Sequence, residues 1–202
     1  DNIFVVTITG TLSGSYNSAE VAKKIYLEEH PNTNIHVINS LSAGGEVDLI
    51  VRKLNQLVAE GLDFDQVVEV ITKYQEKTKL LFVLAKVDNL VKNGRLSKLI
   101  GTVVGLLNIR MVGEASKTGT LELLQKARGQ KKAIKAAFDE LIKAGYNGGH
   151  ITIAHRNNEK FIEQFSELVR EKFARAMIEV LPTSGLCSFY AEEGGLLMGY
   201  EI

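Results

Sequence analysis

The segment of residues 7–16, TITGTLSGSY, concentrates hydroxyl side chains and glycines between an apolar run and a helical pattern. The hydroxyls of Thr9 and Thr11 can donate hydrogen bonds. A helix N-terminus adds free N–H groups and a positive dipole, so this segment suits a bound anion. An ordinary capping turn uses the same residue types, and from the residues alone we favour that simpler interpretation.

Three motifs of catalytic or nucleotide-binding loops are absent here. A P-loop ends in Gly-Lys-Ser/Thr, whereas no lysine precedes Lys23. A nucleophile elbow reads G-x-S-x-G, whereas this segment reads G-x-x-S-G and places Ser13 one position too late. The dinucleotide-binding pattern G-x-G-x-x-G is also missing. A hydrolase or transferase that uses Ser13 as its nucleophile stays an alternative, although the sequence offers no evident base for it.

Two further segments carry cations at predicted turns. Arg95, in NGRLS, follows a turn and could hold a carboxylate or clamp two domains, although we prefer a solvated turn arginine. Arg128, Lys131 and Lys132 lie at the start of a predicted helix, where positive charge opposes the helix dipole. That placement suggests a positive patch for an acidic partner or a phosphate, and a solvated helix end is the alternative that we favour by pattern alone.

The sequence gives little support for a metal site or a catalytic triad. The four histidines show no spacing typical of metal ligands. No Ser–His–Asp triad can be assembled from residue order, because the aspartates fall in helical or capping patterns. Residues 188–195, SFYAEEGG, form a predicted glycine-bearing turn, and we interpret their two adjacent carboxylates as part of a solvated loop.

The elements that must position these residues fall into two parts. Up to residue 79 the patterns predict strand, helix, strand, helix and helix over residues 3–8, 15–29, 35–38, 46–60 and 63–74. Such alternation predicts a parallel sheet in an α/β domain. Two strands are few for such a domain, so we expect the chain to be a fragment whose first domain is incomplete. The predicted division is a remainder of an α/β domain at 1–79 and an α+β domain with a mixed sheet at 80–202.

Composition narrows the class of protein. Of the 202 residues 45% are apolar and 24% are charged, and equal numbers of cations and anions give zero net charge. These values exclude a disordered chain and argue against a large nucleic-acid face. No apolar run approaches the roughly 20 residues that a membrane span needs. The single cysteine, Cys187, fits the reducing cytoplasm.

Several segments together resemble the DegV family of bacterial proteins. The segment LSGSYNSA at 12–19 is similar to the family signature Leu-Ser-Gly-Thr-Tyr-x-Ser-Ala. Five further segments match family motifs in the family order: HVINS at 36–40, NGRLSK at 93–98, LLNIR at 106–110, RGQKKA at 128–133 and IAH at 153–155. Two features differ. The family's Thr-Ser-x-Pro-Ser segment has no match, and Tyr190 occupies the place of a family histidine near the end.

The resemblance implies a two-domain α/β carrier that holds one long-chain fatty acid in an apolar tunnel and presents its carboxylate to a fatty acid kinase. It implies no cofactor, no metal and no catalytic residue of the carrier's own. The ligand-binding residues that it implies are Ser13 with the N–H of Gly14, the neighbouring hydroxyls of Thr9 and Thr11, and Tyr190. Arg128 and Lys131 would face the kinase. The tunnel wall would include one apolar helix, for which an ordinary core helix is the alternative, through Ile100, Val103, Val104 and Leu107. A binding protein for another acidic metabolite is the second alternative.

Overall fold

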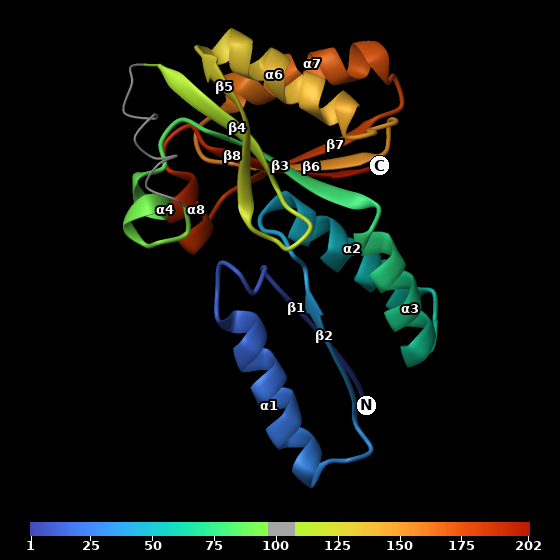
Figure 1. The fold of residues 1–202 in the computed structure, drawn as a ribbon. Coiled ribbons are helices and arrows are strands. Elements are labelled where there is room, and N and C mark those ends of the chain that lie inside the picture. The colour runs from blue at the N-terminus through green and yellow to red at the C-terminus, as the bar shows by residue number, and fades with distance from the viewer. Residues whose placement is uncertain (97–107) are drawn as a thin grey trace.

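The computed structural model describes residues 1–96 and 108–202, which form two β-sheets with helices packed around them (Figure 1). Strands β1 (Asn2–Thr7) and β2 (Asn34–Asn39) pair in parallel as a two-stranded sheet. Helix α1 (Ser15–Glu29) makes the crossover that parallel strands require. The predicted parallel α/β start is confirmed.

The other strands form one mixed sheet of six strands, in the order β5-β4-β3-β8-β6-β7. Neighbouring strands run antiparallel, except that β6 and β7 are parallel. Their bounds are Thr78–Leu84 (β3), Ile109–Ala115 (β4), Leu121–Arg128 (β5), His150–His155 (β6), Met177–Pro182 (β7) and Leu196–Glu201 (β8). The predicted mixed sheet is confirmed. The predicted division after residue 79 falls inside β3 and stays a prediction.

Helices cover both faces of the six-stranded sheet, with α6 and α7 on one side and α2, α4 and α8 on the other (Figure 1). Leu81 and Val83 of β3 join the core under α6 and α7. Phe82 and Leu84 face the opposite way, into a cluster with α4 and α8. Burial on both faces explains why β3 is a continuous apolar run. The bounds of these helices are Gly45–Ala59 (α2), Asp88–Lys92 (α4), Gln130–Lys143 (α6), Glu159–Lys172 (α7) and Gly185–Ala191 (α8).

Helix α2 joins the two sheets, and two glycines allow it to do so. A Cβ on Gly45 would lie 2.1 Å from the carbonyl oxygen of Thr152, and one on Gly199 would lie 2.2 Å from the backbone nitrogen of Glu46. The start of α2 therefore rests directly on β6 and β8. Farther along, α2 shares a second core with β2 and with α3 (Phe64–Gln75).

Capping explains where α3 begins. The side chain of Asp63 accepts a hydrogen bond from the backbone N–H of Gln66, and the Gln66 side chain accepts one from the N–H of Asp63. This reciprocal pair satisfies two N–H groups that a helix start leaves without partners. The helix predicted over residues 63–74 is confirmed, and it begins at Phe64.

The prediction of a turn over residues 188–195 is wrong for its first half, because helix α8 extends to Ala191. Leu186, Tyr190 and Ala191 lie four and five positions apart along α8 and line one cavity together. Leu186 stays exposed, whereas Ala191 is buried and Tyr190 packs against the cluster around Phe82, which holds the helix on the sheet. Gly194 and Gly195, which follow α8, made the whole segment resemble a turn.

The placement of Arg128 also corrects the sequence interpretation. Strand β5 pairs with β4 as far as Arg128, which lies opposite Ile109, so Arg128 ends a strand. Gly129, with φ of 84°, then turns the chain into α6, whose first turn holds Lys131 and Lys132. The predicted apolar helix with Ile100, Val103, Val104 and Leu107 lies outside the described residues.

Candidate functional site

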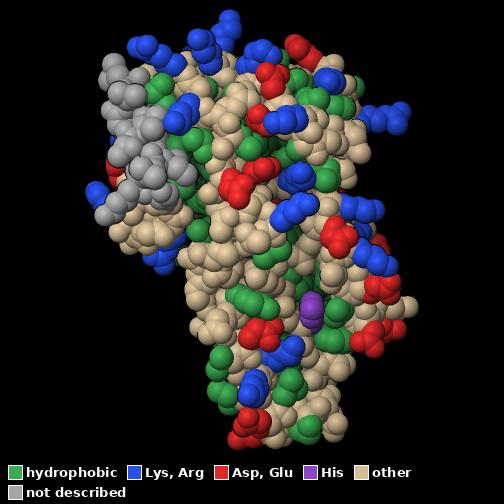
Figure 2. All heavy atoms as spheres, viewed as in Figure 1, with side chains coloured by type: hydrophobic (Ala, Val, Ile, Leu, Met, Phe, Trp, Pro, Cys, Tyr) green, Lys and Arg blue, Asp and Glu red, His purple; other side chains and the backbone are tan. Residues whose placement is uncertain are grey.

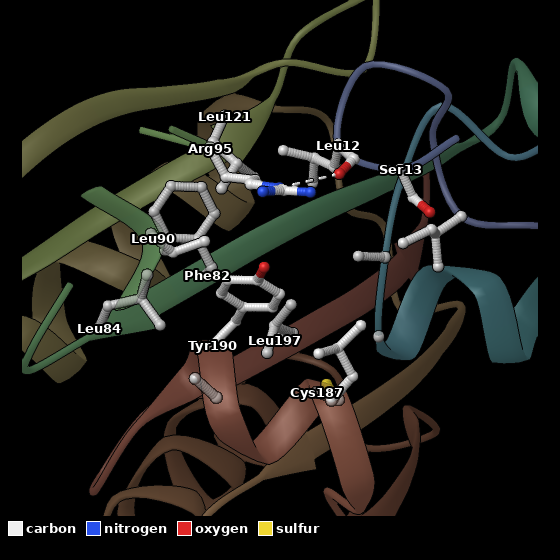
Figure 3. Close-up of a pocket in the computed structure, with 15 residues that line it drawn as sticks. Leu12, Ser13, Phe82, Leu84, Leu90, Arg95, Leu121, Cys187, Tyr190 and Leu197 are labelled. Atoms are coloured by element: carbon white, nitrogen blue, oxygen red, sulfur yellow. Dashed lines mark hydrogen bonds between the residues drawn. The ribbon is translucent and has the colours of Figure 1, made fainter. Parts of the chain in front are cut away.

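A cavity of about 260 Å³ lies on the face of the six-stranded sheet that carries α4 and α8 (Figure 3). The loops that follow β1 and β2 reach over its edge. These loops come from the two-stranded sheet, so the cavity lies between the two sheets. Its described lining residues are Ile8, Leu12, Ser13, Ala43, Gly44, Phe82, Leu84, Leu90, Arg95, Leu121, Leu186, Cys187, Tyr190, Ala191 and Leu197.

The walls of this cavity are apolar. Phe82 and Leu84 project from β3, and Leu197 projects from β8 beside them. Leu90 of α4 and the apolar side of α8 close the wall. Alternate residues of a strand point to the same face, so the neighbouring strands present a continuous apolar surface here. Such a cavity suits a ligand that is mostly hydrocarbon.

Ser13 lies at the polar edge of the cavity. The N–H groups of Leu12 and Ser13 both donate to the carbonyl oxygen of Thr9, at 3.1 and 3.2 Å, which curls the chain back after β1. The Ser13 Oγ accepts a hydrogen bond of 3.2 Å from the N–H of Ser15. A hydroxyl group can accept and donate at the same time, so the O–H hydrogen of Ser13 stays available for a ligand. Gly14 follows as the residue before α1, and the first turn of α1 holds no acidic side chain.

Thr9 and Thr11 hold the loop in place from outside the cavity. Thr9 is fully buried, and its Oγ1 lies 3.0 Å from that of Thr11. Thr11 Oγ1 donates to the carbonyl oxygen of Gly119 at 2.6 Å, in the hairpin between β4 and β5. Gly119 has φ of 80°, and a Cβ there would lie 2.1 Å from Thr9 Oγ1. The two hydroxyls thus fasten the Ser13 loop to the six-stranded sheet.

Arg95 lies in an exposed turn, as the preferred sequence interpretation expects, and its side chain also lines the cavity across from Ser13 (Figure 3). Its Nε donates to the carbonyl oxygen of Leu12 at 3.2 Å, and its Nη1 donates to the carbonyl oxygen of Asn93. Its guanidinium carbon lies 6.0 Å from the centre of the Tyr190 ring. Arg95 therefore clamps the loop after β1 to α8 and brings a positive charge to the cavity edge.

Tyr190 and Cys187 enter the cavity from α8. The hydroxyl of Tyr190 points into the cavity, toward Arg95 (Figure 3). Burial raises the pKa of the Cys187 thiol, so this thiol stays protonated at neutral pH. No histidine, aspartate or glutamate is among the described lining residues. Within the described part of the chain, Ser13 therefore has no base in the cavity to activate it as a nucleophile.

The two residues expected to face a partner lie elsewhere. Arg128 at the end of β5 and Lys131 in the first turn of α6 are both exposed, and neither lines the cavity. Lysine and arginine side chains gather at the end of the molecule over α6 and α7 (Figure 2). In residues 1–96 and 108–202, no three metal-ligating side chains cluster, and no helix has the length and apolarity to cross a bilayer.

Sequence reasoning missed most of the apolar lining. Leu90, Leu186 and Leu197 come from elements that are far apart in the chain, and each one is an unremarkable apolar residue in its own segment. The i, i+4 and i+5 spacing of Leu186, Tyr190 and Ala191 is the one local signal that could have located α8.

The family model described as "Uncharacterised protein, DegV family" matches residues 1–200. The chain belongs to the DegV family. A DegV domain-containing protein of Streptococcus gordonii is 78% identical over 202 residues, which are all of this chain and 72% of that protein. The DegV resemblance expected from the sequence motifs is confirmed.

Solved structures of DegV proteins with bound ligands share this fold. The Streptococcus pneumoniae fatty acid kinase (Fak) B3 protein, loaded with linoleic acid, superposes with a TM-score of 0.98 at 78% identity, over 100% of this chain and 72% of that one. A DegV family protein of Eubacterium eligens, loaded with heptadecanoic acid, gives a TM-score of 0.95 at 39% identity, over 100% of this chain and 73% of that one. These relatives confirm the expected α/β fold class.

Proposed function

We propose that this protein is a carrier that binds one long-chain fatty acid in the cavity between its two sheets and presents the carboxylate to a fatty acid kinase. The observation that carries this proposal is the cavity itself, whose walls are apolar and whose edge holds the Ser13 hydroxyl and the Arg95 guanidinium. The relative loaded with linoleic acid, at 78% identity, supports the same ligand class.

The chemistry of a fatty acid matches the two parts of the cavity. Each buried methylene contributes about 0.8 kcal/mol, so the apolar walls supply most of the affinity. The carboxylate needs charge-assisted hydrogen bonds, which Ser13 and Arg95 are placed to donate from opposite sides of the edge. The N–H of Gly14, at the start of α1, adds a third donor to this proposal.

The other predicted site residues position Ser13 and Arg95 or add a donor. Thr9 and Thr11 position Ser13 through the hairpin contact, and so they act on the ligand indirectly. The Tyr190 hydroxyl is a further donor to the carboxylate, and its ring also supports Arg95.

The proposed partner is the kinase that phosphorylates the bound fatty acid, and the carrier itself is non-catalytic and cytoplasmic. The described lining of the cavity holds no side-chain base, which supports the non-catalytic role. Arg128 and Lys131 are the proposed contacts with an acidic face of the kinase, since both are exposed cations outside the cavity.

Mass spectrometry of an organic extract of the purified protein tests the proposal. We expect a long-chain fatty acid at near-stoichiometric amount, and stabilisation of the stripped protein by added oleate or palmitate. An extract without lipid, together with no thermal shift from either acid, would refute the proposed function. A shift with an acidic metabolite alone would favour the alternative ligand class.

A further inference from the structure

A second cavity, of about 320 Å³, lies on the opposite face of the six-stranded sheet. It lies where β3 ends and where α6 and α7 begin, and Ala85, Gln130 and Asn158 mark these three places in its lining. Arg110 of β4 also lines it and points to the same face as Val112, the face covered by α6 and α7. The sheet therefore separates this cavity from the one proposed for the fatty acid.

The side chain of Arg110 is half-buried, and two of its three guanidinium nitrogens have no partner. Its Nε and Nη1 atoms are inaccessible to solvent, and neither makes a hydrogen bond in the described structure. The side-chain amide nitrogen of Gln130, which lines the same cavity, is also buried and without a partner. Buried N–H donors without an acceptor are unfavourable, because they lose their hydration and nothing replaces it. Two sets of donors without hydrogen-bond partners thus line one cavity.

The acidic residues around this cavity do not supply the missing acceptor. The carboxylate of Glu193 accepts from the side-chain amide of Asn157 at 3.1 Å and lies 3.7 Å from the Nε of Arg156. Glu159 and Lys160 stand in the first turn of α7, and both are exposed to solvent. No ion pair of Arg110 with either carboxylate occurs among the residues that the structure describes.

The loop at Gly194 lies beside the guanidinium of Arg110. A Cβ on Gly194 would lie 3.5 Å from the Nη1 of Arg110, at ordinary van der Waals distance. Asn158 donates its side-chain amide to the carbonyl oxygen of Gly194 at 2.6 Å and does not cap α7 with it. Helix α6 likewise begins without a side-chain cap. The dipoles of both helix starts therefore add positive potential at this cavity.

We propose that this second cavity binds a phosphate-class oxyanion, held by the guanidinium of Arg110 with the amide of Gln130 as a second donor. A guanidinium presents parallel N–H groups that fit two oxygens of such an ion. The ion is either free inorganic phosphate or the phosphoryl group of a phosphomonoester. This proposal does not rest on the fatty acid proposal, since the two cavities lie on opposite faces of the sheet.

Calorimetric titration of the intact protein with inorganic phosphate tests this site, with thermal melting in the same chloride buffer as a second measurement. The variants are Arg110→Met, which removes the charge and keeps much of the volume, and Arg170→Met, a control on the exposed side of α7. We expect saturable phosphate binding in the wild type and in Arg170→Met, and affinity about 10- to 100-fold weaker in Arg110→Met. Without phosphate, Arg110→Met should melt no lower than the wild type, because it lacks the two buried donors that have no acceptor.

A parallel titration with glycerol phosphate separates the two sources of the ion. Binding as tight as that of inorganic phosphate supports the phosphoryl group of a larger molecule, whereas binding of inorganic phosphate alone supports the free ion. If Arg110→Met does not fold, Gln130→Leu replaces it and should weaken phosphate binding about threefold to tenfold. The proposal is overturned if phosphate does not bind, or if chloride at equal ionic strength gives the same effect. It is also overturned if Arg110→Met, or Gln130→Leu in its place, binds phosphate as tightly as the wild type does. Any of these results would indicate a cavity filled by water.

Discussion

Ser13 combines two hydrogen-bonding roles in one hydroxyl group. Its oxygen accepts from the N–H of Ser15 and so fixes the direction of the side chain, while its hydrogen stays available to the cavity. This geometry explains how a residue at a helix start can serve both the fold and a ligand. It also explains why the segment resembles an ordinary capping turn when only the residue types are considered.

Replacement of Ser13 by alanine should weaken fatty acid binding by about 10- to 100-fold, the loss typical of one hydrogen bond to a charged group. The fold should persist, because the remaining turn hydrogen bonds are backbone ones. Displacement of a fluorescent fatty acid measures the affinity, and Ser18→Ala, on the exposed surface of α1, is the matched control. Equal affinities of the two variants would argue against a carboxylate at Ser13.

Arg95 should contribute through its charge as well as through its clamp on the loop. Replacement by methionine is expected to weaken binding of a fatty acid about tenfold or more, and binding of the fatty alcohol of equal chain length much less, because only the acid is charged. Arg95→Lys should restore part of the difference. The exposed Lys92→Met is the control. An equal loss for acid and alcohol would assign Arg95 a purely structural role.

At the scale of the elements, the contact between α2 and β8 depends on a residue without a side chain. Gly199→Ala would place a Cβ 2.2 Å from the backbone nitrogen of Glu46, which cannot move without shifting α2. We expect a loss of about 3 kcal/mol or more in the free energy of unfolding, measured by urea denaturation. Gly14→Ala is the control, since its Cβ meets nothing within 4 Å and should cost only a few tenths of a kcal/mol. A wild-type midpoint for Gly199→Ala would contradict the close approach.

The elements could be predicted from the sequence where the local pattern determines the structure. The apolar patterns over residues 35–38 and 63–74 were sufficient to locate β2 and α3. Helix α8 was missed because its apolar residues pack against a distant strand, and Arg128 was misplaced because pairing with β4 extends β5 beyond its own pattern. Long-range pairing of this kind leaves little trace in a single segment.

The candidate site was only partly predictable for the same reason. Ser13 was found through its motif, whereas Arg95 stands in a turn of ordinary composition. Its position beside Leu12 depends on how the loop after β1 meets α4 and α8, which no local pattern encodes. The Arg110 cavity was not predicted at all, because it exists only where four separate elements end or begin together.

At the scale of the whole molecule, the two sheets are unequally supported. The six-stranded sheet is covered on both faces, whereas α1 buries no residue and leaves Val21 and Ile25 at least half exposed. Apolar side chains are visible at the end of the molecule that holds α1 (Figure 2). Helix α2 therefore carries much of the coupling between the sheets, because it has one core with β2 and α3 and a direct backbone contact with β8.

The carboxyl group of Glu46 lies at this junction and should make the stability of the molecule depend on pH. Burial is the main cause that raises the pKa of Glu46 above its usual value of 4.5, against the opposing effect of the hydrogen bond that Thr78 donates at 2.8 Å. A carboxyl with a raised pKa in the folded state holds its proton to higher pH there than in the unfolded chain. Its contribution to stability is therefore lost as the pH rises from about 4.5 through the folded pKa.

Glu46→Gln should therefore melt at a higher temperature than the wild type at pH 7, and the difference should shrink as the pH falls toward 4.5. The amide oxygen of glutamine can still accept from Thr78, so the packing at the junction is kept. Melting curves across this pH range provide the measurement, and Glu167→Gln on the exposed side of α7 should leave them unchanged. A pH-independent difference between Glu46→Gln and the wild type would mean that Glu46 ionises equally in the folded and unfolded chains. The junction would then be held by its glycine contacts alone, without an electrostatic cost.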